Sequence, residues 1–215
     1  MDAGGDATES KEHFVLVHSA GHGAWCWFRL LPLLRGSGHR VSCVDLAGAA
    51  GSRVAPGSVR SFDEYTAPLV DLLSALPDGE KGVPDLSEFG DVYDLAFGLG
   101  MDHPPTSAAL RPEFQRMILS QQSPQEDSAL ASILLRPWPA ALSAARFGRG
   151  GGDSSAIDQV RRVYITTAKD CMVKPEQQEA MIHRWPPSKV VAMDTDHSPF
   201  FSAPERLFQL IVKLP

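Results

Sequence analysis

The feature that most constrains the fold is an alternation between short apolar runs and helical segments at both ends of the chain. Residues 14–17 (FVLV) are apolar on both faces, a helical segment follows at 24–34, and a second strand-type run covers 40–46. Near the end, strand-type runs at 160–166 and 189–193 flank another helical segment. Buried strands separated by helices are typical of a parallel sheet. We therefore predict an α/β fold in which these four runs form one parallel sheet.

The middle of the chain has a different pattern. Between residues 83 and 152 apolar residues recur at helical spacing, and no run alternates as a strand does. The clearest set is Leu86, Phe89, Val92, Tyr93, Ala96 and Phe97. Pro112 and Pro124 begin two further helical segments, and the second should turn Leu130, Ile133 and Leu134 inward. We predict a helical cap at about residues 84–152, inserted into a single domain that covers 13–215.

Three Ser-x-x-Glu patterns predict helix starts. In each, the serine hydroxyl and the glutamate carboxylate can satisfy backbone N–H groups of the first turn. The pairs are Ser61 with Glu64, Ser123 with Glu126, and Ser202 with Glu205. They predict helices from about 61 to 76, after 124, and at the C-terminal end of the sequence.

Composition and charge exclude several classes of function. With 43% hydrophobic and 21% charged residues the chain is of ordinary globular type, and its net charge of −6 disfavours nucleic acid or an anionic membrane as a partner. Residues 1–12 are small, polar and acidic, which predicts a disordered N-terminus rather than a signal peptide. The three cysteines are widely spaced, which suits reduced thiols in a cytoplasmic protein.

Polar residues follow the predicted strands at their carboxyl ends, where open parallel sheets bind ligands. These residues are His18 and Ser19 after the first strand, Asp45 in the second, and Asp170 and His197 after the last two. An acid followed by a histidine is the chain order of the α/β-hydrolase triad. A carboxylate there fixes the imidazole tautomer and stabilises the imidazolium. Asp170 and His197 are therefore predicted to form a catalytic pair.

The sequence resembles the plant methylesterase and hydroxynitrile lyase family of the α/β hydrolases. The run HFVLVHSAGHGAWCW, from His13 to Trp27, is the most specific part of the resemblance. Supporting runs are VDLA at 44–47, SFDEY at 61–65, SPQED at 123–127 and the pair Asp196–His197. The resemblance extends over most of the chain from about His13.

The resemblance implies roles for individual residues. The triad acid matches Asp170, the triad histidine matches His197, and the N–H of Ala20 matches one oxyanion donor. Ser19 stands where the esterases usually have glycine and the lyases threonine, so it is a candidate oxyanion or substrate-binding residue. Ser198 stands where the lyases have a lysine, which favours the esterase interpretation over the cyanohydrin-cleaving one. No cofactor and no metal are implied, and His18 and His22 lack a third metal ligand at suitable spacing.

One departure from the family is large. The family carries a strand, a G-x-S-x-G nucleophile elbow, a helix and a second strand before the cap, and no G-x-S-x-G occurs in this sequence. Residues 77–81 resemble the approach to that strand, but 82–84 continue directly into the cap. At ordinary element lengths about 40 residues are missing. The nucleophile is therefore unknown, and the core is predicted to be truncated at its central strand.

The resemblance implies hydrolysis of small hormone-type methyl esters, such as methyl salicylate, methyl jasmonate or methyl indole-acetate. Without the elbow serine we expect this activity to be weak or absent. Two alternatives stay open: a non-catalytic binder of a small apolar ester or acid, or a lyase-like relative. A skipped exon near residues 81–84 is a further hypothesis, in which the product folds poorly.

Overall fold

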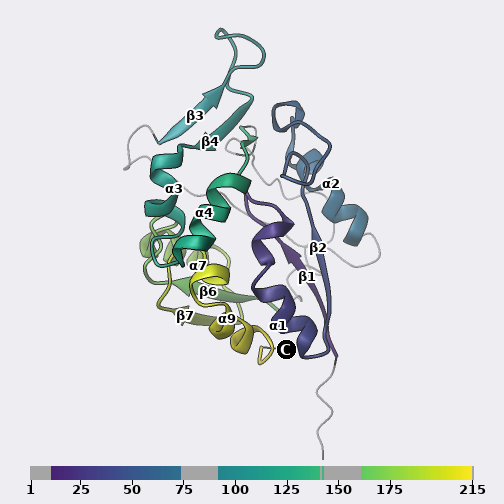
Figure 1. Cartoon of the computed structure of the whole chain (residues 1–215), viewed down its shortest axis with the longest axis vertical. Helices are drawn as coiled ribbons and strands as arrows, with labels where there is room; N and C mark the ends of the chain where they lie inside the picture. Colours follow the sequence, from purple (N-terminus) through teal and green to yellow (C-terminus); the bar gives the residue numbers. More distant parts are fainter. Residues whose placement is uncertain (1–10, 74–91, 141, 143–160, 215) are drawn as a thin grey trace, which may run out of the picture.

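The computed structural model, which describes residues 11–73, 92–140, 142 and 161–214, contains two pairs of parallel strands (Figure 1). β1 (His13–Val17) pairs with β2 (Arg40–Val44) in parallel register. β6 (Val163–Thr167) pairs with β7 (Lys189–Met193) in the same way. The predicted strands are therefore present, each with parallel pairing.

The prediction of one continuous parallel sheet is wrong. Within the described residues, β1 and β2 form one two-stranded sheet, and β6 and β7 form another. Strands pair only when neighbours lie about 4.8 Å apart. Among the described residues no strand other than β2 pairs with β1 and none other than β7 pairs with β6, which agrees with the prediction that central strands are missing from the sequence.

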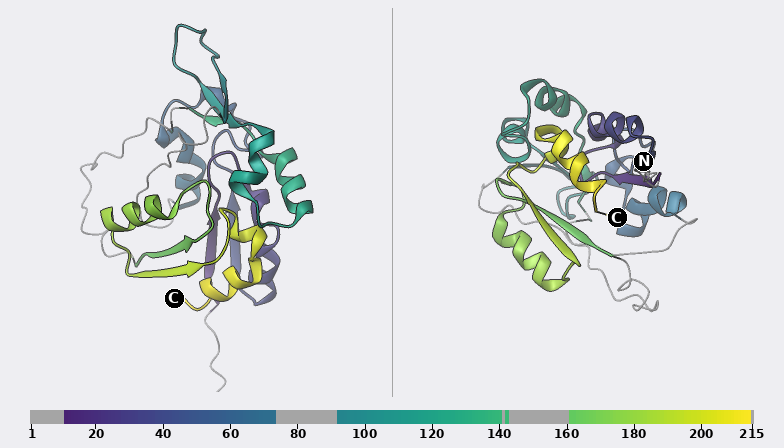
Figure 2. Two further views of the ribbon diagram at one scale, coloured as in Figure 1. Left: turned by 90° about the vertical axis from the view of Figure 1, so that its left-hand side faces the viewer. Right: turned by 90° about the horizontal axis from the view of Figure 1, so that it is seen from below.

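Side-chain packing joins the two strand pairs instead of a hydrogen-bond ladder. Leu16 of β1 and Met193 of β7 belong to one buried cluster, together with Leu34 and Leu207. Leu34 lies on α1 (Leu30–Gly36), and Leu207 lies on α9 (Pro204–Ile211), which packs against α1 (Figure 2). The core is therefore shared between the two halves of the chain.

Helices follow the strands where the sequence predicts them, with shorter bounds. The segment 24–34 divides into a 3-10 helix, η1 (Ala24–Trp27), and α1, and Gly38 after α1 has φ 85°, the left-handed conformation that favours glycine. α2 (Phe62–Leu73) begins as predicted, because the Glu64 N–H donates to the Ser61 hydroxyl at 3.1 Å.

The cap region contains strands as well as helices, so the prediction of an all-helical cap is wrong. β3 (Tyr93–Ala96), β4 (Ser107–Leu110) and β5 (Trp138–Pro139) form an antiparallel sheet. Of the predicted set, Val92 is buried and Tyr93 is half-buried, but Ala96 at the end of β3 is exposed, so the helical spacing does not describe one buried face. Residues 86 and 89 of the same predicted helix lie outside the described residues.

Two helices of the cap region lie between β4 and β5, namely α3 (Pro112–Leu119) and α4 (Gln125–Leu134). α4 buries Asp127 and Ala131, whereas Leu130 and Ile133 are exposed. The prediction that these two aliphatic side chains face inward is therefore wrong. An ion pair orients the helix: the partly exposed Arg29 donates through Nη2 to Oδ1 of the buried Asp127 at 2.7 Å.

The C-terminal part continues the α/β order. α7 (Pro175–Arg184) connects β6 to β7, and the short α8 (Pro199–Ser202) precedes α9. A short 3-10 helix, η2 (Pro56–Ser58), lies between β2 and α2. Within the residues that the structure describes, every helix is too short or too polar to cross a bilayer.

Candidate active site

The structure brings Asp170 and His197 into direct contact. His197 Nδ1 lies 2.9 Å from Asp170 Oδ2, and each residue follows a parallel strand at its carboxyl end. The carboxylate can only accept, so Nδ1 carries the proton and Nε2 of the neutral ring keeps its lone pair. The Asp170 side chain is 4% exposed, while that of His197 is 20% exposed. The pair therefore offers a base held by a buried acid.

Asp170 is held by four donors. Its Oδ1 accepts from the backbone N–H groups of Met172 and Val173, both at 2.8 Å, and its Oδ2 accepts from the Thr167 hydroxyl at 2.8 Å as well as from His197. Burial by itself would raise the pKa of Asp170. The hydrogen bond and charge of His197, joined by the Val173 N–H and the Thr167 hydroxyl, outweigh burial and hold this pKa below its ordinary value. Asp170 is therefore ionised at neutral pH.

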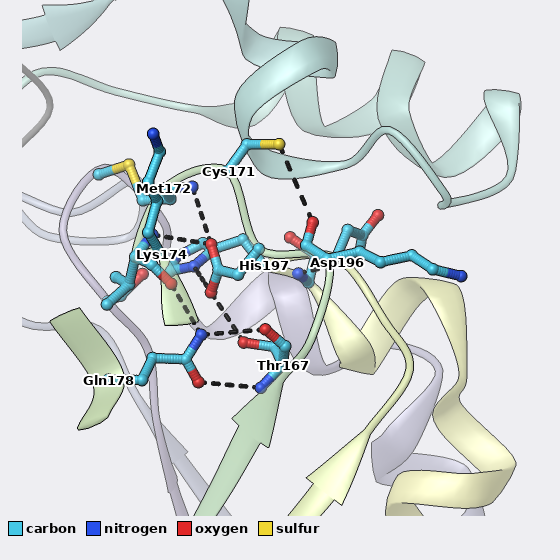
Figure 3. Close-up of polar contacts among 12 residues, drawn as sticks. Thr167, Cys171, Met172, Lys174, Gln178, Asp196 and His197 are labelled. Carbon is cyan, nitrogen blue, oxygen red and sulfur yellow. Dashed lines mark hydrogen bonds and ion pairs between the residues drawn. The ribbon is translucent and has the colours of Figure 1, made fainter. Parts of the chain in front are cut away.

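Gln178 supports the loop that carries Asp170. Its amide pairs with the backbone of Thr167, accepting from the N–H and donating to the carbonyl, both at 2.9 Å (Figure 3). The same amide also donates to Val173 O at 2.7 Å. Gln178 is 2% exposed on α7 and continues the ladder of β6 where that strand ends. Sequence reasoning missed it, because a lone glutamine in a helix carries no pattern.

The predicted oxyanion residues, Ser19 and Ala20, lie in a tight turn after β1. The His22 N–H donates to Ser19 O at 3.2 Å, and Gly21 has φ 77°, which the third position of a type II turn requires. The cap region fixes this turn, because the Arg136 N–H donates to Gly21 O at 2.9 Å. Both Ser19 and Ala20 are exposed, and among the described residues no acceptor faces the Ala20 N–H.

The contact between His22 and Ser19 does not activate the Ser19 hydroxyl as a nucleophile. Its Nδ1 lies 3.3 Å from both the Ala20 carbonyl and the Ser19 hydroxyl. Because a carbonyl only accepts, Nδ1 carries the proton and cannot take one from Ser19. The pKa of His22 is lowered to about 4, chiefly by burial, with smaller contributions from the nearby charges of His197 and His18. The hydroxyl of Ser19 is therefore bonded to a weak base that presents its N–H.

Two other polar residues at strand ends have structural contacts. His18 accepts from the Leu46 N–H at Nε2 and contacts Ser19 O at Nδ1, so its ring bridges the ends of β1 and β2. Asp45 accepts from the Ala24 N–H at 2.8 Å, which holds the start of η1. A Cβ on Gly51 would lie 2.2 Å from Asp45 Oδ2, so only glycine fits there. Neither contact brings His18 or Asp45 to the Asp170–His197 pair.

A small pocket lies between the cap region and the core. It is lined by His22, Gln115, Leu119, Ser120, Ser128, Ala131, Leu135, Ser198 and Phe201. Its space corresponds to about one water molecule. Ser198, adjacent to the base, is 1% exposed, and its hydroxyl has no hydrogen-bond partner among the described residues. Ser198 is thus a polar wall of this pocket.

Comparison with known proteins places this chain among plant esterases. It is 39% identical to Methylesterase 17 of Arabidopsis thaliana, over 94% of this chain and 90% of that protein. The crystal structure of the methylesterase protein MES16 from Arabidopsis matches with a TM-score of 0.80 at 34% identity, covering 94% of this chain and 97% of the other. No family model matches the chain.

A third match carries a ligand in its own structure. Tomato methylketone synthase I complexed with 2-tridecanone has a TM-score of 0.82 at 26% identity, covering 95% of this chain and 98% of that one. These matches confirm the α/β-hydrolase fold. The alignment with Methylesterase 17 runs over 249 residues, more than the 215 of this chain, so that relative has a segment with no counterpart here.

Proposed function

This chain belongs to the plant methylesterase family of the α/β-hydrolase superfamily, and from that premise we propose that it hydrolyses methyl esters of small apolar carboxylic acids at a low rate. The observation that carries the proposal is the 2.9 Å contact between His197 Nδ1 and Asp170 Oδ2. We place the substrate among hormone-type esters such as methyl salicylate, methyl jasmonate or methyl indole-acetate. The small apolar ligand of methylketone synthase I supports an apolar partner.

The proposed chemistry uses water as the nucleophile. His197 Nε2 removes a proton from water while the water oxygen attacks the ester carbonyl carbon. The N–H of Ala20 donates to the oxyanion, and Asp170 stabilises the imidazolium. When the tetrahedral species collapses, the C–O bond to the methoxy group breaks and the leaving oxygen takes the proton from His197. The products are the carboxylic acid and methanol, and the base is restored.

The expected rate is low for two chemical reasons. The elbow serine is missing from the sequence, and so is the residue after it, which supplies the second oxyanion donor in this superfamily. Loss of one such donor alone costs about 10²- to 10³-fold in kcat. Water must also be positioned without the entropic advantage of an attached nucleophile. We expect hydrolysis near the rate of free imidazole.

The experiment compares hydrolysis of p-nitrophenyl acetate and one hormone methyl ester by four proteins. These are the wild type, His197→Ala, Asp170→Asn and Ser19→Ala. A slow wild-type rate that is lost in His197→Ala, reduced in Asp170→Asn and kept in Ser19→Ala supports the proposal. A fast wild-type rate that both Ser19→Ala and His197→Ala abolish would make Ser19 the nucleophile.

A second candidate function is a non-catalytic binder of the same esters or acids. The missing elbow serine favours it, because the buried contacts of Asp170 remain while the nucleophile does not. Thermal unfolding with and without salicylic acid or methyl jasmonate distinguishes the two functions. An increase in Tm without turnover indicates a binder.

A further inference from the structure

Asp196 is a fully buried carboxylate that the proposed chemistry does not use. It precedes His197 in the chain and lies beside it in Figure 3. None of its surface is exposed. A buried charge is tolerated only when hydrogen bonds satisfy it. Asp196 meets that condition with four donors, two on each oxygen.

The two carboxylate oxygens of Asp196 accept hydrogen bonds from different parts of the molecule. Oδ2 accepts from the Gln122 N–H at 2.9 Å and from the Ser123 hydroxyl at 3.1 Å, both between α3 and α4 in the cap region. Oδ1 accepts from the Ser198 N–H at 3.0 Å and from the Ser202 hydroxyl at 2.8 Å, on the other side of His197. The carboxylate thus ties the loop of the base to the cap region.

The same cap segment also contacts the loop of the acid. The side chain of Gln121 donates through Nε2 to Lys169 O, directly before Asp170. The residues Gln121–Ser123, here called the cap clamp, therefore bond to both loops of the Asp170–His197 pair. These contacts do not involve the pair itself.

Ser123 and Ser202 bond to Asp196 and do not cap the helices that follow them. Ser123 and Ser202 begin Ser-x-x-Glu patterns, yet α4 and α9 start without a side-chain cap. Both hydroxyls donate to Asp196 instead. A hydrogen bond to an ionised carboxylate is stronger than one to a neutral acceptor, so these donations hold each serine at Asp196.

From these contacts we propose that Asp196 is a positioning residue, which with the cap clamp holds His197 against Asp170. Displacing the cap segment leaves Asp196 Oδ2 buried without its donors, so the loop of His197 shifts with it. The acid–base contact then depends on the cap being docked. The inference builds on the proposed function, but its test does not require turnover.

The readout is the NMR resonance of the His197 Nδ1 proton, identified by its absence in His197→Ala. A proton held by a hydrogen bond to a buried carboxylate exchanges slowly with water, so the signal reports the contact directly. We expect Asp196→Asn and Ser123→Ala to lose the resonance at temperatures where the fold is retained. If Asp196→Asn does not fold, Ser123→Ala and Gln121→Ala carry the test.

Matched controls separate positioning from general destabilisation. Asp127→Asn changes a buried carboxylate that does belong to the cap region, pairs with Arg29 and contacts neither loop. Ser132→Ala removes a hydroxyl that bonds only within α4. We expect the resonance to persist in both. Its persistence in Ser123→Ala and Gln121→Ala, or equal loss in Asp127→Asn at equal Tm, overturns the inference. Absent turnover in the wild type with this resonance pattern overturns only the proposed function.

Discussion

Replacing His22 with phenylalanine is expected to make the protein less sensitive to mild acid. His22 is 3% exposed, stacks on Trp25 at a centroid distance of 5.7 Å, and meets Phe200 edge-on at 6.0 Å. Phenylalanine keeps these ring contacts and removes the titration. Loss of the contacts to Ser19 and Ala20 shifts stability by an amount that does not depend on pH.

The magnitude follows from the pKa of His22, which burial lowers from 6.5 to about 4. Between these two pH values the unfolded chain binds a proton that the folded chain does not, so the free energy of unfolding falls as the pH falls. Each pKa unit corresponds to 1.36 kcal/mol, so the loss approaches about 3 kcal/mol by pH 4. Well above pH 6.5 both states are unprotonated and the group contributes no pH dependence.

The assay is urea unfolding followed by tryptophan fluorescence at several pH values from 7.5 to about 4.5. The quantity compared is the difference in unfolding free energy between wild type and His22→Phe, in which the contributions of other groups cancel. It should change by about 2 kcal/mol between pH 7.5 and pH 5. His183→Phe, on an exposed side chain of α7, is the control. A difference that stays constant with pH would refute the argument.

Two further outcomes are expected. Gln178→Leu should lower the free energy of unfolding by about 3 kcal/mol, because the buried backbone of Thr167 and Val173 loses three hydrogen bonds; a loss below about 1 kcal/mol in urea unfolding would contradict this. Within the described part of the chain β1 and β6 each have an edge that pairs with no other strand, so the protein should self-associate, seen as a sedimentation coefficient that rises with concentration. A single species of 23.3 kDa at all concentrations would contradict that expectation.

The strands and the acid–base pair could be predicted because their signals are local. β1, β2 and β7 are short apolar runs bounded by polar residues, and the order of Asp170 and His197 after parallel strands is sufficient to bring them to one edge. The alternation of strands and helices, however, says only which layers form. It does not say which strands are neighbours, so the division into two sheets was not predictable from the alternation.

Other features depend on partners far away in the sequence. Ser123 has the local pattern of a helix cap, but its hydroxyl donates a hydrogen bond to Asp196, 73 residues later in the chain. β3 is exposed except for the half-buried Tyr93, and its four residues form a strand by pairing with β4. His22 had no assigned role, since its place between Ser19 and His197 is visible only after folding.

The hydrogen bonds around Asp170 have a consequence for how a protein of this family can evolve. Thr167, Met172, Val173 and Gln178 all belong to the β6–α7 segment, so the acid brings its own support with it. Removing strands elsewhere in the sheet leaves this support untouched. An esterase of this kind can therefore lose its nucleophile while its acid and base stay assembled. A serine brought within reach of His197 Nε2 would then meet an acid–base pair that is already assembled.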